Sequence, residues 1–186
     1  MDYTPFVLNL QPQLQPIPDI RAAAWQGDAQ AQNDLGLIYM KGSRGVTQSD
    51  AQATAWFAKA AEQGLADAQY NLGRMYENGR SAAKDDVQAA SWYRKAAEQG
   101  HAAAQNKLGW IHMKGRGVPQ NDVQAAAWFR KAAEQGHADA QYNLGWMHRD
   151  GRGVAKDEAQ AIAWFRKAAQ QGDSNAQYWL DRMGAR

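Results

Sequence analysis

A segment of 36 residues recurs four times along the chain, and this periodicity constrains the fold more than any other feature. It is clearest in a block that reads Trp-(Phe or Tyr)-x-Lys-Ala-Ala-(Glu or Gln)-Gln-Gly. The tryptophans that open the block are Trp56, Trp92, Trp128 and Trp164, and the glycines that close it are Gly64, Gly100, Gly136 and Gly172. A repeat of this length is one supersecondary unit that buries its apolar face against its neighbours, so the sequence predicts a solenoid.

Start and stop signals predict the second helix of each unit. A capping residue precedes the apolar stripe, and its side-chain oxygen can accept a hydrogen bond from an unpaired backbone N–H. An acidic residue follows the capping residue, at the positive end of the helix dipole. A glutamine three residues after the cap fits a capping box. About 14 residues later, a glycine can take the left-handed conformation that ends a helix. The caps are Ser49, Asp85, Asn121 and Asp157, and the glutamines are Gln52, Gln88, Gln124 and Gln160.

The first helix of each unit carries an apolar stripe, which in the third unit is Ala104, Leu108 and Ile111. A glycine follows the leucine in mid-helix, where it costs about 1 kcal/mol relative to alanine. Its recurrence predicts that another helix approaches too closely for a Cβ atom, and the expected neighbour is the aromatic pair of the second helix, such as Trp128-Phe129. We expect both aromatic residues to be core. The mid-helix glycines are Gly36, Gly73, Gly109 and Gly145.

The chain divides into an arm and one solenoid domain. Residues 1–18 carry four of the five prolines and no repeat, which predicts an extended arm, packed on the first helices through Phe6, Val7 and Leu8. The fold class is all-α with about ten helices. We expect a leading half unit at 19–27, full units at 28–64, 65–100, 101–136 and 137–172, and a closing helix at 173–186.

Composition excludes several kinds of site and partner. The 186 residues include no cysteine, which excludes disulfides, thiolate zinc sites and cysteine nucleophiles. A net charge of +2 gives no argument for nucleic acid as a partner, and no apolar run approaches the ~20 residues of a transmembrane helix. The sequence shows no secretory leader, so it predicts a cytoplasmic protein as it stands, or a periplasmic one if a leader was removed. The oligomeric state is not predicted.

The repeat pattern resembles a known family. It reads A-x-x-x-L-G-x-x-Y-x-x-G-x-G-V, then D-x-x-x-A-x-x-W-[FY]-x-K-A-A-E-Q-G, and it is similar to the Sel1-like repeat, a cousin of the tetratricopeptide repeat, over residues 19–183. The resemblance implies a right-handed α-solenoid with a concave face built mainly from the first helices. It also implies adaptor or partner-binding roles, and some bacterial members are immunity proteins that bind a secreted toxin. Ser81-Ala82 depart from the Gly-Val of the turn, which leaves its conformation open.

Two histidines offer the main candidate for chemistry. His112 and His148 occupy equivalent positions of successive units. The first two units have Tyr39 and Tyr76 in this column of equivalent positions. The two histidines could form a metal pair or a general base; the favoured alternative is that histidine replaces a partly buried tyrosine and keeps its hydrogen bond. The sequence has no HExxH, GxSxG or GxxxxGK[ST] arrangement. We therefore predict no catalytic residue, no metal and no cofactor.

Two columns of basic residues recur with the repeat. They could bind acidic partners, or they could form a solvated face that pairs with the chain's own acids. Glu62, Glu98 and Glu134 stand three residues after three of the lysines and favour the second interpretation. The columns are Arg44, Arg80, Arg116 and Arg152 in the turns, and Lys59, Lys95, Lys131 and Lys167 in the second helices.

Positions that vary between units predict the partner-binding face. In the first helices they lie two before, two after and five after the recurring leucine, a spacing that places them on one helical face. They are rich in tryptophan, tyrosine, methionine and arginine, which are enriched at interface cores. Trp110 and Trp146 stand one unit apart and are expected to be neighbours; alternatively they pack together or under the arm. The candidates are Leu37, Met40, Tyr70, Arg74, Glu77, Asn106, Trp110, Met113, Tyr142, Trp146, Arg149 and Tyr178.

These observations predict a non-enzymatic module that holds a protein or peptide partner in a concave groove. A more specific version is an immunity protein that neutralises a secreted bacterial toxin. The alternative of another class is a cell-wall-related hydrolase, which would need a clustered acid, base or metal. A purely structural spacer would not need a variable aromatic groove.

Overall fold

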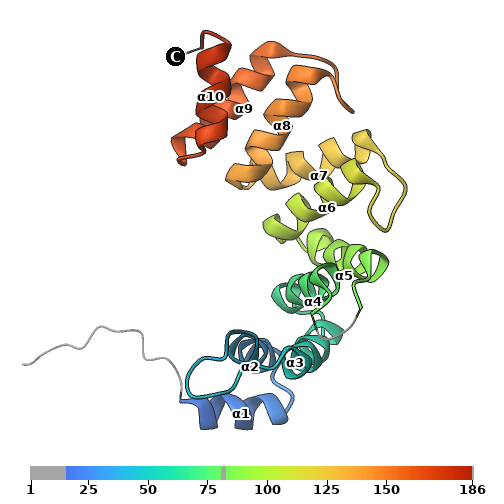
Figure 1. Cartoon of the computed structure of the whole chain (residues 1–186), viewed down its shortest axis with the longest axis vertical. Coiled ribbons are helices and arrows are strands. Elements are labelled where there is room, and N and C mark those ends of the chain that lie inside the picture. The colour runs from blue at the N-terminus through green and yellow to red at the C-terminus, as the bar shows by residue number, and fades with distance from the viewer. Residues whose placement is uncertain (1–15, 81–82, 186) are drawn as a thin grey trace, which may run out of the picture.

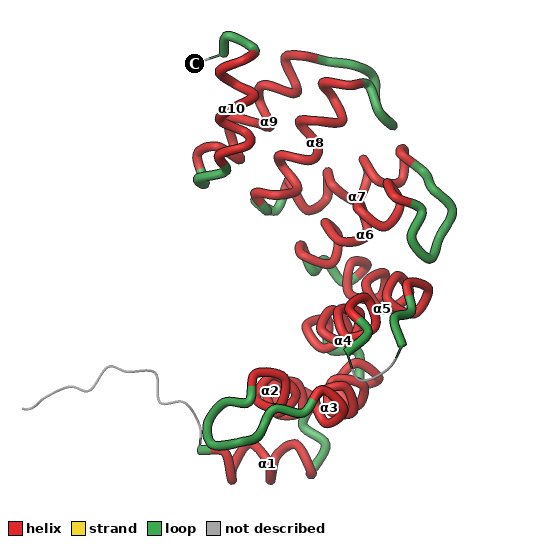
Figure 2. The backbone as a smooth tube through the Cα atoms, in the orientation of Figure 1, coloured by secondary structure: helices red, strands yellow, loops and turns green. Residues whose placement is uncertain are grey.

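The computed structural model describes residues 16–80 and 83–185, and these residues form helices and short connections without a strand. Successive helices pack on one another, and together they curve into an arc (Figures 1 and 2). The all-α solenoid and its ten helices are confirmed. The helices are α1 (Ile17–Trp25), α2 (Ala29–Lys41), α3 (Asp50–Glu62), α4 (Ala66–Asn78), α5 (Asp86–Glu98), α6 (Ala102–Lys114), α7 (Asp122–Glu134), α8 (Ala138–Asp150), α9 (Glu158–Gln170) and α10 (Ser174–Arg182).

The boundaries at the N-terminus differ slightly from those expected. Helix α1 begins at Ile17, so residues 17–18 belong to the solenoid and not to the arm. Residues 1–15 of the arm, with the expected packing of Phe6, Val7 and Leu8, lie outside the described residues, and so do Ser81 and Ala82. None of the helices in the described ranges is long and apolar enough to span a membrane.

The second helices of the units begin at the predicted caps. Asn121, for example, accepts a hydrogen bond from the backbone N–H of Gln124 at 3.0 Å. The capping box also predicts that the glutamine side chain accepts from the backbone N–H of the cap residue. This part is wrong, because the backbone N–H of Asn121 donates to the carbonyl of His112 at 2.9 Å. The same bond recurs in the other units and anchors each turn to the preceding helix. The glutamines of the expected box are exposed to solvent.

The mid-helix glycines are sites of close helix approach, as predicted. A Cβ atom on Gly109 would lie 2.6 Å from the ring of Phe129. The corresponding glycines of the other units meet the equivalent ring of Phe57, Tyr93 or Phe165. The second member of each aromatic pair therefore makes the contact, and replacing the glycine would push the two helices of a unit apart.

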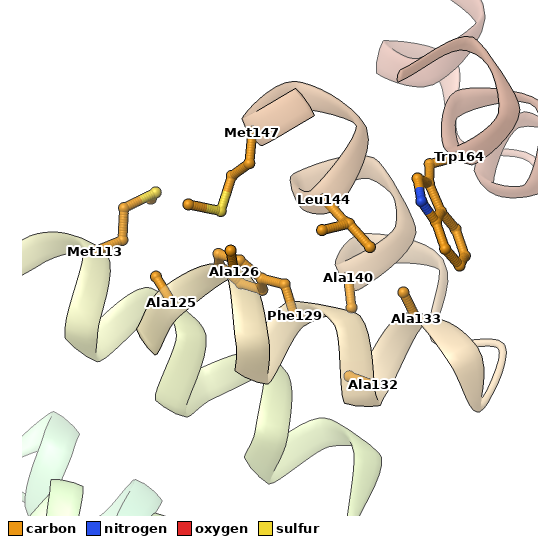
Figure 3. Packing of buried hydrophobic residues seen from close by; sticks show 10 residues of the cluster. All are labelled: Met113, Ala125, Ala126, Phe129, Ala132, Ala133, Ala140, Leu144, Met147 and Trp164. Atoms are coloured by element: carbon orange, nitrogen blue, oxygen red, sulfur yellow. The ribbon is translucent and has the colours of Figure 1, made fainter. Parts of the chain in front are cut away.

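The core is a row of small clusters, one after another along the arc. In the cluster of Figure 3, Phe129 packs with Leu144 and Met147, and all three side chains are fully buried. Trp128 is only half-buried, so the expectation that both aromatic residues of a pair are core is wrong for this unit. Its ring lies 4.2 Å from the Nζ atom of Lys131.

The lysine column covers tryptophan rings in all four units. The Nζ atoms of Lys59, Lys95, Lys131 and Lys167 lie 3.9–4.3 Å from the ring centroids of Trp56, Trp92, Trp128 and Trp164. No ion pair joins this column to a glutamate within the described ranges. The interpretation of these lysines as partners of the nearby glutamates is therefore wrong, since the cations instead contact aromatic faces.

Buried glutamines join each unit to the next. The Nε2 atom of Gln105 donates to the carbonyl of Ala97 at 3.0 Å, and its Oε1 atom accepts from Nε2 of Gln135 at 2.7 Å. The arrangement repeats along the solenoid, where Gln32, Gln69 and Gln141 take the place of Gln105. The ladder satisfies buried polar groups and sets the spacing of the units.

Candidate partner-binding surface

A hollow with a volume of about 610 Å³ opens over α4, α6 and α8. All three are first helices of their units, so the hollow lies on the side of the solenoid where the varying residues were expected to bind. Helix α6 contributes most of its wall. The lining residues are Glu77, Asn106, Lys107, Trp110, Ile111, Lys114, Arg116 and Asp139.

Glu77 is the best-anchored charge of the hollow. Its carboxylate accepts a 2.6 Å hydrogen bond from the Tyr93 hydroxyl, and the Nζ atom of Lys107 lies 3.0 and 3.2 Å from its two oxygens. Burial acts to raise the pKa of Glu77, but the hydrogen bonds from Tyr93 and Lys107 outweigh it and hold that pKa below its usual value. Burial and the same carboxylate raise the pKa of Tyr93 far above its usual range. Glu77 is therefore ionised, and Lys107 neutralises its charge.

Trp110 forms the apolar part of the hollow. Its side chain is 39% exposed, one of the largest exposed hydrophobic groups of the described chain. The edge of its ring meets Phe129 at 6.2 Å between centroids, and Lys114 lies 5.7 Å from the ring. The indole is thus held from beneath by the core while a large part of it stays open to a partner.

The arginine of the hollow, Arg116, departs from its column. Arg80 pairs with Asp50 and Arg152 with Asp122, each at 2.8 Å, which confirms for these two the interpretation of arginines paired with the chain's own acids. The equivalent acid for Arg116 is Asp86, which instead contacts Lys84 at 3.4 Å. Within the described ranges Arg116 has no ion pair.

Two of the predicted binding residues are buried and therefore closed to a partner. Asn106 accepts a 3.1 Å hydrogen bond from the side chain of Asn143 in the next unit. Met113 is 5% exposed and lies in the core cluster beside Met147 (Figure 3). Glu77, Asn106 and Trp110 are the predicted residues that line the hollow. Of these three, only Trp110 presents an open surface, because Asn106 is buried and Glu77 is engaged by Lys107.

Four predicted residues of the first two units are half-buried and do not line the hollow. Leu37 and Met40 pack against the core cluster of the α3–α4 region. Tyr70 stacks on the ring of His101 at 4.7 Å, and the guanidinium of Arg74 lies 5.8 Å from the Tyr70 ring. All four side chains keep part of their surface exposed.

The predicted residues nearer the C-terminus form a separate group of aromatic and arginine side chains. Arg149 lies 3.8 Å from the ring of Trp179 and 5.8 Å from that of Trp146. Tyr142 packs on Phe165, whereas Tyr178 is 53% exposed. No ring contact joins Trp146 to Trp110 in the described part of the chain. The candidates therefore fall into two patches.

Five residues of the hollow were missed from the sequence, and one of them, Ile111, had been assigned to the apolar stripe of its helix. Lys107 carries a signal, since it replaces the asparagine found at this position as Asn71 and Asn143. Arg116 carries none, because arginine recurs at its position in every unit and only the tertiary structure removes its partner. The other two missed residues are Lys114 and Asp139.

The histidine column holds two buried side chains. His112 and His148 are 8% and 7% exposed, and the Nδ1 atom of each lacks a hydrogen-bond partner among the described residues. Burial lowers the pKa of both, and the nearby cations Arg94 and Arg130 lower it further. No group of three metal-ligating side chains occurs in the described ranges. Buried histidines in place of tyrosines agree with the favoured interpretation, but the hydrogen bond that it included is not found at either Nδ1 atom within the described chain.

His101 has a structural role that the sequence did not reveal. Its Nδ1 atom accepts the backbone N–H of Ala104 at 3.1 Å and so caps helix α6. Its Nε2 atom lies 3.2 Å from the carboxylate of Asp67. The residue thus positions the start of the helix that forms most of the hollow.

Comparison with known proteins agrees with this architecture. The Sel1 repeat family model matches residues 29–65, 66–101, 102–137 and 138–173. A Sel1 repeat protein from Oxalobacter formigenes is 44% identical, with a TM-score of 0.83, over 90% of this chain and 48% of its own. A protective antigen of uropathogenic Escherichia coli strains, described as displaying an SLR fold, is 40% identical, with a TM-score of 0.85, over 88% of this chain and 35% of its own.

A more distant structure shares the fold alone. An immunity protein from Pseudomonas aeruginosa is 22% identical, with a TM-score of 0.57, over 94% of this chain and 66% of its own. Comparison with curated proteins finds no significant match. This chain spans about half or less of the length of the two more similar structures. Four matched repeats cover most of the sequence, and the chain belongs to the Sel1 repeat family.

Proposed function

We propose that this chain is a non-enzymatic binding module that holds a protein or peptide partner against α4, α6 and α8. Sel1 repeats typically mediate protein–protein interactions and are generally non-enzymatic scaffolds. The observation that carries the proposal is the 610 Å³ hollow floored by the 39% exposed Trp110. An open indole set among arginine and lysine side chains has the composition of an interface hot spot.

The electrostatics of the hollow support binding over catalysis. Glu77 is held in its ionised form by two donors, so its carboxylate is not available to exchange protons near neutral pH. The hydrolase alternative would require a paired acid and base, and a proton-donating acid needs a raised carboxyl pKa, whereas the pKa of Glu77 is lowered. The contacts fix charges in place, which suits recognition.

A photo-crosslinking experiment tests the binding proposal. Benzoylphenylalanine replaces Trp110 in the hollow, or Val123, which is 64% exposed on α7 and outside the hollow, as the matched control. Irradiation of cells that express each variant should give one dominant protein adduct from position 110 and none from position 123. Equal labelling from both positions, or no adduct from position 110, would contradict the proposal.

A narrower version of the proposal makes the partner a secreted toxin. The structural neighbour from Pseudomonas aeruginosa is named an immunity protein, and this name is the observation that favours the version. Expression of the crosslinked partner should then arrest growth, and co-expression of the wild-type chain should restore it. A Trp110→Ala chain should fail to restore growth; a partner without toxicity would exclude the immunity role and leave the binding role intact.

A further inference from the structure

We infer that the hollow over α6 selects a partner segment with an acidic side chain one or two residues from an apolar one. The acid pairs with Lys114 and Arg116, and the apolar side chain packs on Trp110. This inference rests on the proposed binding function and names the chemistry of the partner.

The charges of the hollow are unequally satisfied. Lys107 is engaged by Glu77 at 3.0 Å. Lys114 and Arg116 both line the hollow, and within the described ranges neither forms an ion pair with an acid, although the charge of Arg116 helps to lower the pKa of Glu77. Arg80 and Arg152, the equivalents of Arg116, each hold an aspartate. Two cations therefore remain open at the end of α6 and can accept a carboxylate.

The spacing of residues along α6 sets the arrangement of the partner. Lys107, Trp110 and Lys114 stand at intervals of three and four residues and share one helical face. A rise of ~1.5 Å per residue places Lys107 and Lys114 roughly 10 Å apart along the axis, with Trp110 between them. About three residues of extended peptide cover this length. An acid bound at Lys114 and Arg116 thus brings the apolar side chain one or two residues away over Trp110.

The acids of the hollow exclude a continuous polyanion. Asp139 lines the hollow from the first turn of α8, and Glu77 lines it from α4. A nucleic-acid backbone would bring phosphates towards these carboxylates as well as towards the cations. The chain's net charge of +2 gives no general attraction to compensate. A short protein segment with a single acid avoids this repulsion, and it is the occupant that the charges favour.

Peptide selection followed by affinity measurement tests the inference. A phage-displayed library of random heptapeptides is selected on the immobilised full chain, and the enriched peptides are labelled with fluorescein. We expect a consensus with Asp or Glu one or two positions from an aromatic or large aliphatic residue. Arg116→Gln should weaken binding of these peptides about tenfold or more, as loss of one charge-assisted contact predicts. Arg152→Gln, at the equivalent position of the next unit, is the matched control and should leave binding unchanged.

A charge-reversal variant adds a second measurement, because a variant that is merely unstable would not gain binding to a new peptide. The double variant with Lys114→Glu and Arg116→Glu should lose the acidic peptides and bind versions in which lysine replaces the acid. Circular dichroism melting identifies any variant that fails to fold.

Other outcomes separate this inference from the function on which it rests. A consensus without an acid, unchanged affinity in Arg116→Gln or no enriched peptide would overturn the inference. If peptides or a crosslinked protein then bind through Trp110 or Trp146 without Arg116, the binding function stands. A missing adduct at position 110, or equal labelling from positions 110 and 123, removes that function as well.

Discussion

The hydroxyl of Tyr93 on α5 donates a 2.6 Å hydrogen bond to the carboxylate of Glu77 on α4. The other units place Phe57, Phe129 and Phe165 where this unit has Tyr93. None of them has an acid at the position of Glu77. The pair therefore occurs once, and with Lys107 it anchors the charge at the edge of the hollow.

Tyr93→Phe should lower the free energy of unfolding by about 1.5–3 kcal/mol, because it removes a hydrogen bond to a charged group. The ring that packs on Gly73 remains, so the core itself should be unchanged. Urea denaturation of the single variants and of the double variant with Glu77→Gln measures the coupling. Additive losses in the double variant would show that the two side chains do not stabilise each other.

Gly109→Ala should destabilise the protein even though alanine is the better helix former. The added Cβ atom would stand 2.6 Å from the ring of Phe129, and overpacking of this kind costs about 1–3 kcal/mol after the ring shifts. Thermal unfolding followed by circular dichroism checks the change. Adding Phe129→Leu should cost less in the Gly109→Ala background than in the wild type. A more stable Gly109→Ala protein would contradict the close approach.

Phe129→Ala should cost about 3–5 kcal/mol, because its side chain is fully buried in the cluster of Figure 3. Trp128→Ala should cost less despite the larger side chain, since Trp128 is half-buried and one ring face is covered by Lys131. Urea denaturation of the Phe129→Ala and Trp128→Ala variants shows which of the two loses more unfolding free energy. A greater loss for Trp128→Ala would place that indole in the core after all.

Acid should destabilise the fold through His112 and His148. Burial lowers the folded-state pKa of each below the usual 6.5, so the unfolded chain binds protons more readily than the folded one. The stabilisation by these neutral rings is complete above pH 6.5. It falls as the pH drops from 6.5 towards the lowered folded pKa.

The variant with His112→Tyr and His148→Tyr carries the residue of the first two units at both positions and should depend less on pH. The urea midpoints of the variant and the wild type are measured from pH 7.5 down to ~pH 5, the lower edge of the pH range in which proteins are usually most stable. Parallel pH profiles would show that neither histidine titrates on unfolding.

Local chemistry allowed much of the fold to be predicted. Caps such as Asn121 and terminators such as Gly100 act on residues three to five positions away, so their effect can be derived from spacing alone. The contact of Gly109 with the aromatic pair was predictable because it recurs in each unit. The choice of Phe129 over Trp128 was not, because the register of the two helices decides it.

The candidate site depended on contacts that cross between units. Asn106 looked like a free polar group, but Asn143, 37 residues later, binds it in the interior. Met113 looked like a surface anchor, but the curvature of the stack places it in the next core cluster. Variation between units identified Trp110 and Glu77, and it could not show which varying residues the stack buries.

The sequence by itself determined the repeat, the ten helices and most of their ends, because these follow from periodicity and hydrogen bonds within a few residues. Only the tertiary structure decided which charges stay open. Asp86 contacts Lys84 while its counterpart Asp122 holds Arg152, and Arg116 is left to line the hollow. The Arg152–Asp122 pairing joins residues of successive units, and its geometry exists only once the units have stacked.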